Sequence, residues 1–263
     1  MRMTLTRWLS VVGVAILMAV GLAVTGPDVT AQVSADADDI AGTVSGAGGP
    51  EAGVWVIAET NDLATLFRKI VVTDGAGRYV VPDLPPANYN VWVRGYGLKD
   101  SDPVSGSPGT ALDLRVAQAA SPREAAQVYP ANYWYSLVEV PPSSAFPGTG
   151  DGGNGISTGM QNQAQWVDGL KQGCQLCHQL GNQATREVLN PSEFDSTEAA
   201  WAHRVQAGQR GAMMSGGLRR FGEDRVVSMY ADWTDRIMAG EVPPAPPRPQ
   251  GRERDVVLTM WEW

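Results

Sequence analysis

The sequence predicts a multidomain protein in which an all-β sandwich is followed by an all-α domain. Between residues 40 and 117, short runs rich in valine, isoleucine and aromatic residues alternate with turn residues, which is typical of a sandwich. Between residues 163 and 240, apolar residues recur at helical spacing and the runs end at glycines. A length of 263 residues, 43% of them hydrophobic and 18% charged, fits two folded domains.

Residues 1–31 have the pattern of a secretory signal peptide. Arg2 and Arg7 precede the apolar run Trp8–Val24, and Val29-Thr30-Ala31 forms a small-residue cleavage site before Gln32. No twin-arginine pair is present, so we expect the general secretory route. This predicts a periplasmic or secreted protein. An uncleaved membrane anchor is the alternative, because the apolar run is long enough to span a bilayer marginally.

Residues 38–120 are expected to form the sandwich. The turn signal Asp74-Gly75-Ala76-Gly77 separates two of its predicted strands. The strands are predicted from runs of β-branched and aromatic residues, or from alternation of apolar with polar residues. They lie at Gly53–Thr60, Lys69–Thr73, Arg78–Val81, Tyr89–Arg94 and around the alternating Leu112, Leu114 and Val116.

Spaced positions in this region carry a resemblance. They are Gly42-Thr43-Val44, Gly53-Val54, Thr73-Asp74, Gly77, Tyr79, Leu84-Pro85, Tyr89, Val91, Val93 and Gly95-Tyr96. Over Ile40–Val116 they resemble the carboxypeptidase regulatory-like domain, a small transthyretin-like β-sandwich. The resemblance implies a scaffold or binding role, with carbohydrate as one ligand class, or a mere spacer. Asn88 replaces a family glycine, and we expect it to adopt the left-handed turn conformation that asparagine tolerates.

Residues 121–159 are predicted to be a connector. It contains an aromatic patch of Tyr129, Tyr133, Trp134 and Tyr135, and then thins into a glycine-rich end at 146–153. The glycine-rich end is expected to be flexible. The aromatic patch is either a docking surface or a cluster that packs on its own domain.

Cys174-Gln175-Leu176-Cys177-His178 is the most informative motif of the chain. This C-x-x-C-H run uses both cysteines and one of the two histidines. Its spacing is typical of c-type haem attachment, because two thiols on one helical turn can reach both vinyl groups of a porphyrin. The sequence therefore predicts one covalent haem c on Cys174 and Cys177, with His178 as the proximal iron ligand.

Three other interpretations of the cysteines are open. A redox thiol pair of the thioredoxin kind belongs beside a βαβ pattern, which this sequence lacks. A zinc site would need Cys174, Cys177, His178 and the distant His203, a spacing that matches no zinc finger. A disulfide across two residues would be strained.

The region 160–247 is expected to fold as helices around this motif. Helices are predicted at Gln163–Gln172, ending at Gly173, from the cap Asp195–Glu198 through Val205 to Gly208, and at about Glu223–Ala239. A helix leading into C-x-x-C-H, a methionine loop and a late helix resemble the class I c-type cytochromes. The resemblance covers about Met160–Pro247 and implies a cytochrome c-like haem domain.

The sixth iron ligand is predicted to be Met214, with Met213 as the alternative, because both lie in a glycine-flanked stretch expected to be a loop. Met229 and Met238 are expected in the core of the late helix. His203 is expected on the surface. Val242 stands where some cytochromes have the ligating methionine of a G-x-M-P-P stretch.

Residues 248–263 form a C-terminal tail after the proline-rich linker Pro243–Pro249. Asp255–Trp263 reads like a strand, and a lone strand does not fold by itself. Either it pairs with the sandwich, or it leads into a further β domain that is truncated here, since longer proteins of this kind continue into a β-propeller.

Together these features predict an exported monohaem electron carrier, not an enzyme, which exchanges electrons with redox partner proteins. The net charge of −8 argues against nucleic acid as a partner. One alternative is a surface or carbohydrate-binding protein in which haem is incidental. Another is a haem enzyme such as a peroxidase, which needs an open iron position.

Overall fold

A computed structural model describes residues 35–188, 190–256 and 259–262. The predicted signal peptide and its cleavage site lie outside the described residues. None of the helices within the described ranges is both long and apolar enough to cross a membrane.

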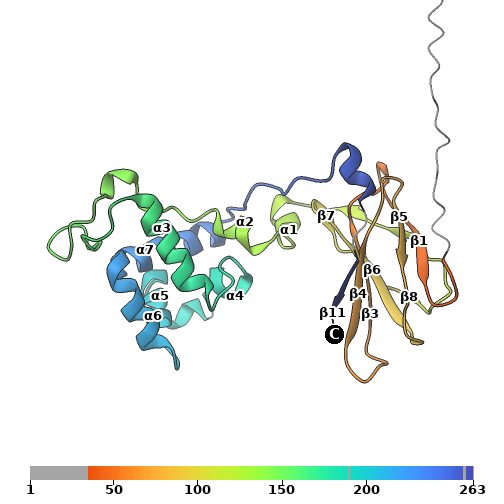
Figure 1. Ribbon diagram of the computed structural model, residues 1–263, viewed down its shortest axis with the longest axis horizontal. Helices are drawn as coiled ribbons and strands as arrows, with labels where there is room; N and C mark the ends of the chain where they lie inside the picture. The colour runs from red at the N-terminus through yellow and green to blue at the C-terminus, as the bar shows by residue number, and fades with distance from the viewer. Residues whose placement is uncertain (1–34, 189, 257–258, 263) are drawn as a thin grey trace, which may run out of the picture. The chain divides into compact units, whose positions relative to one another are not determined.

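The N-terminal part is a sandwich-like pair of β-sheets (Figure 1). In the first sheet, β1 (Ile40–Gly46) pairs with β2 (Gly49–Pro50), β5 (Arg78–Val81) and β9 (Leu114–Arg115). The second has the order β11 (Thr259–Glu262), β4 (Phe67–Val72), β3 (Trp55–Thr60), β6 (Tyr89–Arg94) and β8 (Val104–Gly106). The short strands β7 (Leu98–Lys99) and β10 (Ala117–Gln118) form a separate two-stranded sheet.

Alternation along the strands builds the core between the sheets. In β6, Tyr89, Val91 and Val93 are buried while Asn90 is exposed. Val91 and Val93 lie opposite Ala58 and Val56 of β3, which are also buried. The burial alternates because side chains on one face of a strand repeat every second residue. Strands β5 and β6 have the predicted bounds, residues 78–81 and 89–94.

The predicted turn at Asp74–Gly77 connects β4 of the second sheet to β5 of the first. Oδ1 of Asp74 accepts hydrogen bonds from the amides of Ala76 and Arg78. Gly77 has φ +74°, and a Cβ there would lie 2.5 Å from the carbonyl oxygen of Val44. The expectation that Asn88 adopts the left-handed conformation was wrong. Among the described non-glycine residues, that conformation occurs at Asp83 and Asn190. The left-handed turn therefore falls at Asp83, whose amide donates to Oδ1 of Asp39.

The rest of the chain is helical. The helices are α1 (Pro122–Ala126), α2 (Ala131–Tyr135), α3 (Gln163–Gln175), α4 (Gln183–Arg186), α5 (Thr197–Gln206), α6 (Gly211–Leu218) and α7 (Glu223–Met238). Short 3₁₀ turns are η1 (Ser143–Ala145), η2 (Pro191–Glu193), η3 (Arg219–Phe221) and η4 (Gly251–Asp255).

Helix α7 forms the centre of the helical core. Its predicted apolar face is buried, at Val226, Tyr230, Trp233 and Ile237. Helix α5 begins at Ser196, whose hydroxyl accepts the amide of Ala199, and ends before Gly208 as predicted.

The segment 121–159 belongs to this helical core. Tyr129, Trp134 and Ile156 are buried in the same cluster as α7. The indole Nε1 of Trp134 donates to the carbonyl of Ala126 at 3.1 Å. The glycine-rich end folds into a closed loop. The amide of Gly150 donates to the carbonyl of Ile156, and the amide of Gly155 donates to the carbonyl of Gly150. The structure thus supports the packing interpretation of the aromatic patch, and this segment is not the linker that its composition suggested.

The C-terminal tail pairs with the sandwich. The backbone of β11 lies antiparallel to β4, with Met260 opposite Ile70. Upstream of it, the guanidinium of Arg248 binds Glu51 at 2.9 Å and the carbonyl of Ala52 at 2.8 Å. The strand-like tail therefore finds its partner within this chain, which is the first of the two expected alternatives.

Candidate haem-attachment site

The C-x-x-C-H motif occupies one helical turn at the end of α3. The helix does not stop at Gly173, as predicted, but runs through it to Gln175, since Gly173 is not among the described glycines with positive φ. The carbonyl of Cys174 accepts the amides of Cys177 at 3.2 Å and of His178 at 3.0 Å. Helix α3 thus ends within the motif, and these two bonds fold Cys174 to His178 into the turn that closes it.

The side chains of the motif differ in exposure. Cys177 and His178 are exposed, and Leu176 between the cysteines is 85% exposed. Cys174 is half-buried and packs against the helical core.

Both cysteines are free thiols, which the disulfide interpretation does not predict. Within the part of the chain that the structure describes, the cluster of three or more potential metal ligands is Asp36, Asp38 and Asp39 in the sandwich. The four candidate zinc ligands are therefore not brought together, and no observation favours zinc at the motif.

An open groove of about 630 Å³ lies against the motif. One wall is the start of α2 with Pro130, Ala131 and Asn132, and the other is the motif segment Gln175–Leu180. The two walls approach closely just after the motif, where a Cβ on Gly181 would lie 1.9 Å from the carbonyl oxygen of Ala131. Gly181 has φ +94°, so both its conformation and this approach require glycine.

Two arginines hold the chain that follows the motif. Arg186 is buried, stacks over Trp134 at 4.1 Å and donates to the carbonyl of Gly181 at 2.9 Å. Arg204 of α5 stacks over Trp201 at 4.8 Å and donates to the carbonyls of Ala184 and Glu187. Burial lowers the pKa of both guanidinium groups. These contacts hold the chain from Gly181 to Glu187, directly after the motif, against α2 and α5.

Inward of Cys174 lies a buried hydroxyl without a regular hydrogen bond. Burial raises the pKa of the Cys174 thiol, and the adjacent hydroxyl of Tyr230 partly offsets this. Tyr230 is 3% exposed, and among the described residues its hydroxyl makes no hydrogen bond of regular geometry, although Cys174 lies within reach of it. An unsatisfied buried hydroxyl costs about 1–3 kcal/mol. Sequence reasoning did not single out Tyr230 as a site residue, because its position on α7 reads as core.

These features fit a covalently attached haem. Reduced thiols and an imidazole share one turn, two of the three groups are exposed beside an open groove, and a buried polar group sits next to the third. Cys174, Cys177 and His178 are the residues that would hold the group.

The predicted methionine loop is a helix, α6. The expectation of a loop is therefore wrong, and glycine content did not prevent helix formation under tertiary packing. Gly211 and Leu218 are buried and Met214 is half-buried, so these three share the inner face of α6, while Met213 is 56% exposed. Met214 is thus the more buried of the two methionines, and its bond to iron stays a prediction.

The remaining candidates are distributed as follows. Met229 is buried as expected, but Met238 is 50% exposed, so its assignment to the core was wrong. His203 is exposed on α5, with its ring 5.3 Å from that of Phe194. Val242 is half-buried against the helical core.

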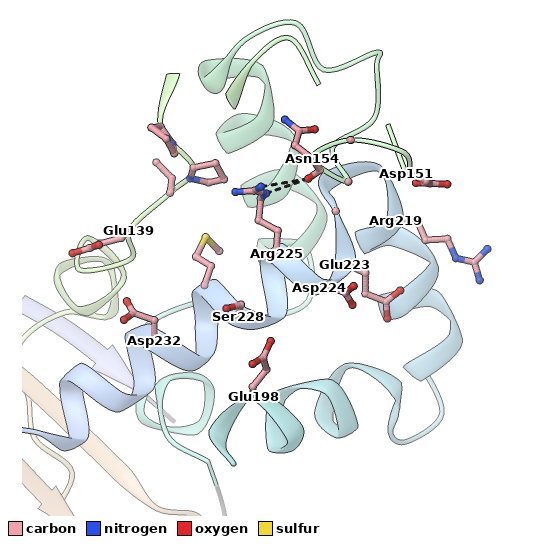
Figure 2. A pocket seen from close by; sticks show the side chains of 17 residues that line it. Glu139, Asp151, Asn154, Glu198, Arg219, Glu223, Asp224, Arg225, Ser228 and Asp232 are labelled. Carbon is pink, nitrogen blue, oxygen red and sulfur yellow. Dashed lines mark hydrogen bonds between the residues drawn. The ribbon is translucent and has the colours of Figure 1, made fainter. Parts of the chain in front are cut away.

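A second groove, of about 1100 Å³, contains none of the motif residues (Figure 2). Its lining is rich in carboxylates, with Glu198 of α5 facing the start of α7. Arg225 reaches across to the carbonyl of Asn154 at 3.4 Å. Sequence analysis missed this groove, although the acidic first turns of α5 and α7 were visible signals.

Comparisons with known proteins add little to this description. No protein-family model matches the chain, and no curated protein matches it. Among solved structures, an N-terminal interface mutant of a type II cohesin–X-dockerin complex from Acetivibrio cellulolyticus aligns with 14% identity and a TM-score of 0.26. The alignment covers 40% of this chain and 76% of that chain, and a TM-score this low carries no argument about fold or function.

Proposed function

We propose that this chain is an exported monohaem c-type cytochrome-like protein. It transfers single electrons through one covalent haem c, with the β-sandwich as an accessory module. The observation that carries the proposal is the single turn in which the carbonyl of Cys174 accepts the amides of both Cys177 and His178. The same turn presents free thiols beside an open groove.

The attachment chemistry needs the thiol state. Addition of each S–H across a vinyl C=C bond forms one C–S bond and one C–H bond, and it leaves no by-product and transfers no net electrons. Two free cysteines therefore suffice, and the exposed Cys177 is accessible for this reaction.

Once bound, haem supplies a one-electron iron couple whose potential depends on axial ligands and surroundings. His178 would bind iron through a ring nitrogen, and Met214 is the proposed second axial ligand. The helical core around Trp201, Tyr230 and Trp233 would keep water from the Cys174 side. The electron donor and acceptor are redox proteins, and the sandwich is proposed to serve as a scaffold, with carbohydrate as one ligand class.

The test is expression of the full chain with export and a haem-attachment machinery, followed by pyridine haemochrome analysis of the purified protein. We expect one covalent haem per chain. The double variant Cys174→Ala/Cys177→Ala is expected to lose it, while His203→Ala should keep it as a matched control. A colourless wild-type protein would contradict the proposal.

The spectrum of the oxidised protein then separates a carrier from a catalyst. A low-spin spectrum with a methionine–iron band supports electron transfer. A high-spin spectrum would instead favour a haem enzyme with an open iron position, such as a peroxidase.

A further inference from the structure

The buried hydroxyl of Tyr230 lies beside Cys174 and has no role in the proposed function so far. Its ring is held on two sides: it stacks on Trp201 at 4.9 Å with an interplanar angle of 23°, and it contacts Trp233 at 6.0 Å. With the side chain 3% exposed, the hydroxyl cannot turn to water without breaking this packing.

The polar groups beside this hydroxyl are those of Tyr135 and Cys174. Burial raises the pKa of the Tyr230 hydroxyl well above its ordinary value, and the neighbouring Tyr135 and Cys174 raise it further through charge and hydrogen bonding. The ring of Tyr135 is positioned in turn by Trp233, edge-on at 6.2 Å. Two hydroxyls and one thiol therefore meet at the inner side of the motif. Tyr135 and Cys174 lie within hydrogen-bonding reach of the Tyr230 oxygen, but neither makes a hydrogen bond of regular geometry with it.

Attachment of haem changes the hydrogen-bonding capacity of Cys174. A thiol has its own hydrogen and can donate or accept, so it competes with Tyr230 for the role of donor. A thioether sulfur has no hydrogen and can only accept. After attachment, the Tyr230 hydroxyl is then the sole donor of this pair, and Tyr135 can donate to the Tyr230 oxygen.

We propose that Tyr230 is a positioning residue whose hydroxyl donates a hydrogen bond to the sulfur of Cys174 once that sulfur is a thioether. This inference rests on the proposed function. The bond holds the Cys174 side of the attachment and draws electron density from the sulfur, which makes loss of an electron from the attached group less favourable. The Tyr230 hydroxyl thereby gains a hydrogen-bond acceptor of regular geometry in the haem-bearing protein.

The test compares Tyr230→Phe with wild type, because phenylalanine keeps the ring packing and removes the hydroxyl. The variant is expected to attach haem but to have a lower reduction potential. A neutral hydrogen bond corresponds to a change of about threefold in the one-electron equilibrium, or about 28 mV at 59 mV per tenfold. Resonance Raman spectra should show a shifted C–S stretching band.

Two more variants sharpen the result. Tyr135→Phe should lower the reduction potential by less, because it removes the hydrogen bond that Tyr135 donates to the Tyr230 oxygen and leaves the bond from Tyr230 to sulfur in place. Tyr129→Phe, a buried tyrosine in the same core, should leave the potential and the C–S band unchanged.

The outcomes separate the two proposals. A wild-type protein without covalent haem overturns the proposed function itself. A haem-bearing wild type whose potential and C–S band are unchanged in Tyr230→Phe overturns only this inference. A shift of equal size in Tyr129→Phe would also overturn it, since the effect would then be one of general packing.

Discussion

The indole Nε1 of Trp233 donates a 2.9 Å hydrogen bond to the backbone carbonyl of Trp134, a residue 99 positions earlier in the chain. This bond joins α7 to α2, and α2 forms one wall of the groove at the haem-attachment motif. The geometry of the candidate site therefore depends on a contact between distant segments.

Substitution of Trp233 tests this dependence. Trp233→Phe removes the hydrogen bond and part of a fully buried side chain, so we expect a loss of about 2–4 kcal/mol in the free energy of unfolding. Urea denaturation followed by far-UV circular dichroism measures it. Trp92→Phe is the control, because Trp92 is half-buried and its indole bonds to the partly exposed Glu59, so its loss should be below about 1 kcal/mol. Equal losses in the two variants would contradict the central role of Trp233.

The close approach at Gly181 gives a second prediction. Gly181→Ala would place a Cβ 1.9 Å from the carbonyl oxygen of Ala131, at a residue with φ +94°. We expect a loss of about 3 kcal/mol or more, since both backbone strain and overlap must be relieved. Gly208→Ala has the same conformational demand, φ +72°, but no atom within 4 Å, and should cost about 1 kcal/mol. The melting temperatures of both variants test this prediction. Similar values would contradict it, because they would show that α2 moves away from the new methyl group at little cost.

The two thiols of the protein without haem should react at different rates. Cys177 is exposed, whereas Cys174 is half-buried and burial raises the pKa of its thiol above the ordinary value of 9.0. Because the thiolate is the nucleophile, alkylation of Cys174 should be the slower reaction at pH 8 and should keep accelerating as the pH rises beyond 9.0. Mass spectrometry after timed iodoacetamide treatment measures both rates. In urea the difference should disappear, and a faster Cys174 in the folded protein would contradict the observed burial.

The sandwich should lose stability at alkaline pH. Burial, with a smaller effect of Asp113, raises the pKa of Tyr79 well above 10.0, and its hydroxyl donates to the carbonyl of Leu112 at 2.8 Å. An unfolded tyrosine ionises near 10.0, so the stabilisation is complete below that pH and is lost as the pH rises above it toward the folded-state pKa. Tyr79→Phe should cost about 1 kcal/mol at pH 7 and should show a shallower decline above pH 10. Urea unfolding at a series of pH values tests this, and identical slopes in both proteins would refute it.

The axial ligand can be tested with two neighbouring residues. In the haem-bearing protein, Met214→Ala should lose the methionine–iron band and lower the reduction potential, because methionine ligation raises it. Met213→Ala should leave both unchanged, since Met213 lies on the outer face of α6. An unaltered low-spin spectrum and potential in Met214→Ala would exclude Met214 as the ligand.

The parts of the fold that were predicted from sequence are those that depend on local pattern. The turn at Asp74–Gly77 located β5, alternation located β6, helical periodicity located α7, and the cap sequence Asp195–Glu198 located the start of α5. At the candidate site, spacing alone identified Cys174, Cys177 and His178, because attachment to one porphyrin requires a fixed local order.

The parts that were missed depend on tertiary contacts. Residues 121–159 look like a linker by composition, but Trp134 becomes core only because Trp233 lies against it. Glycine-rich α6 looks like a loop, but packing of Gly211 and Leu218 keeps it helical. The unsatisfied hydroxyl of Tyr230 cannot be read from sequence at all, since its lack of a hydrogen bond of regular geometry is a property of the folded neighbourhood.

The pairing of β11 with β4 has a consequence for biosynthesis. Until residues 259–262 have reached the compartment in which the chain folds, one edge of the five-stranded sheet offers unpaired backbone groups to any neighbouring polypeptide. The sandwich is therefore the first domain to emerge and the last to be completed. A chain that stalls within the helices would carry an unpaired strand edge that needs chaperone protection from association with other chains.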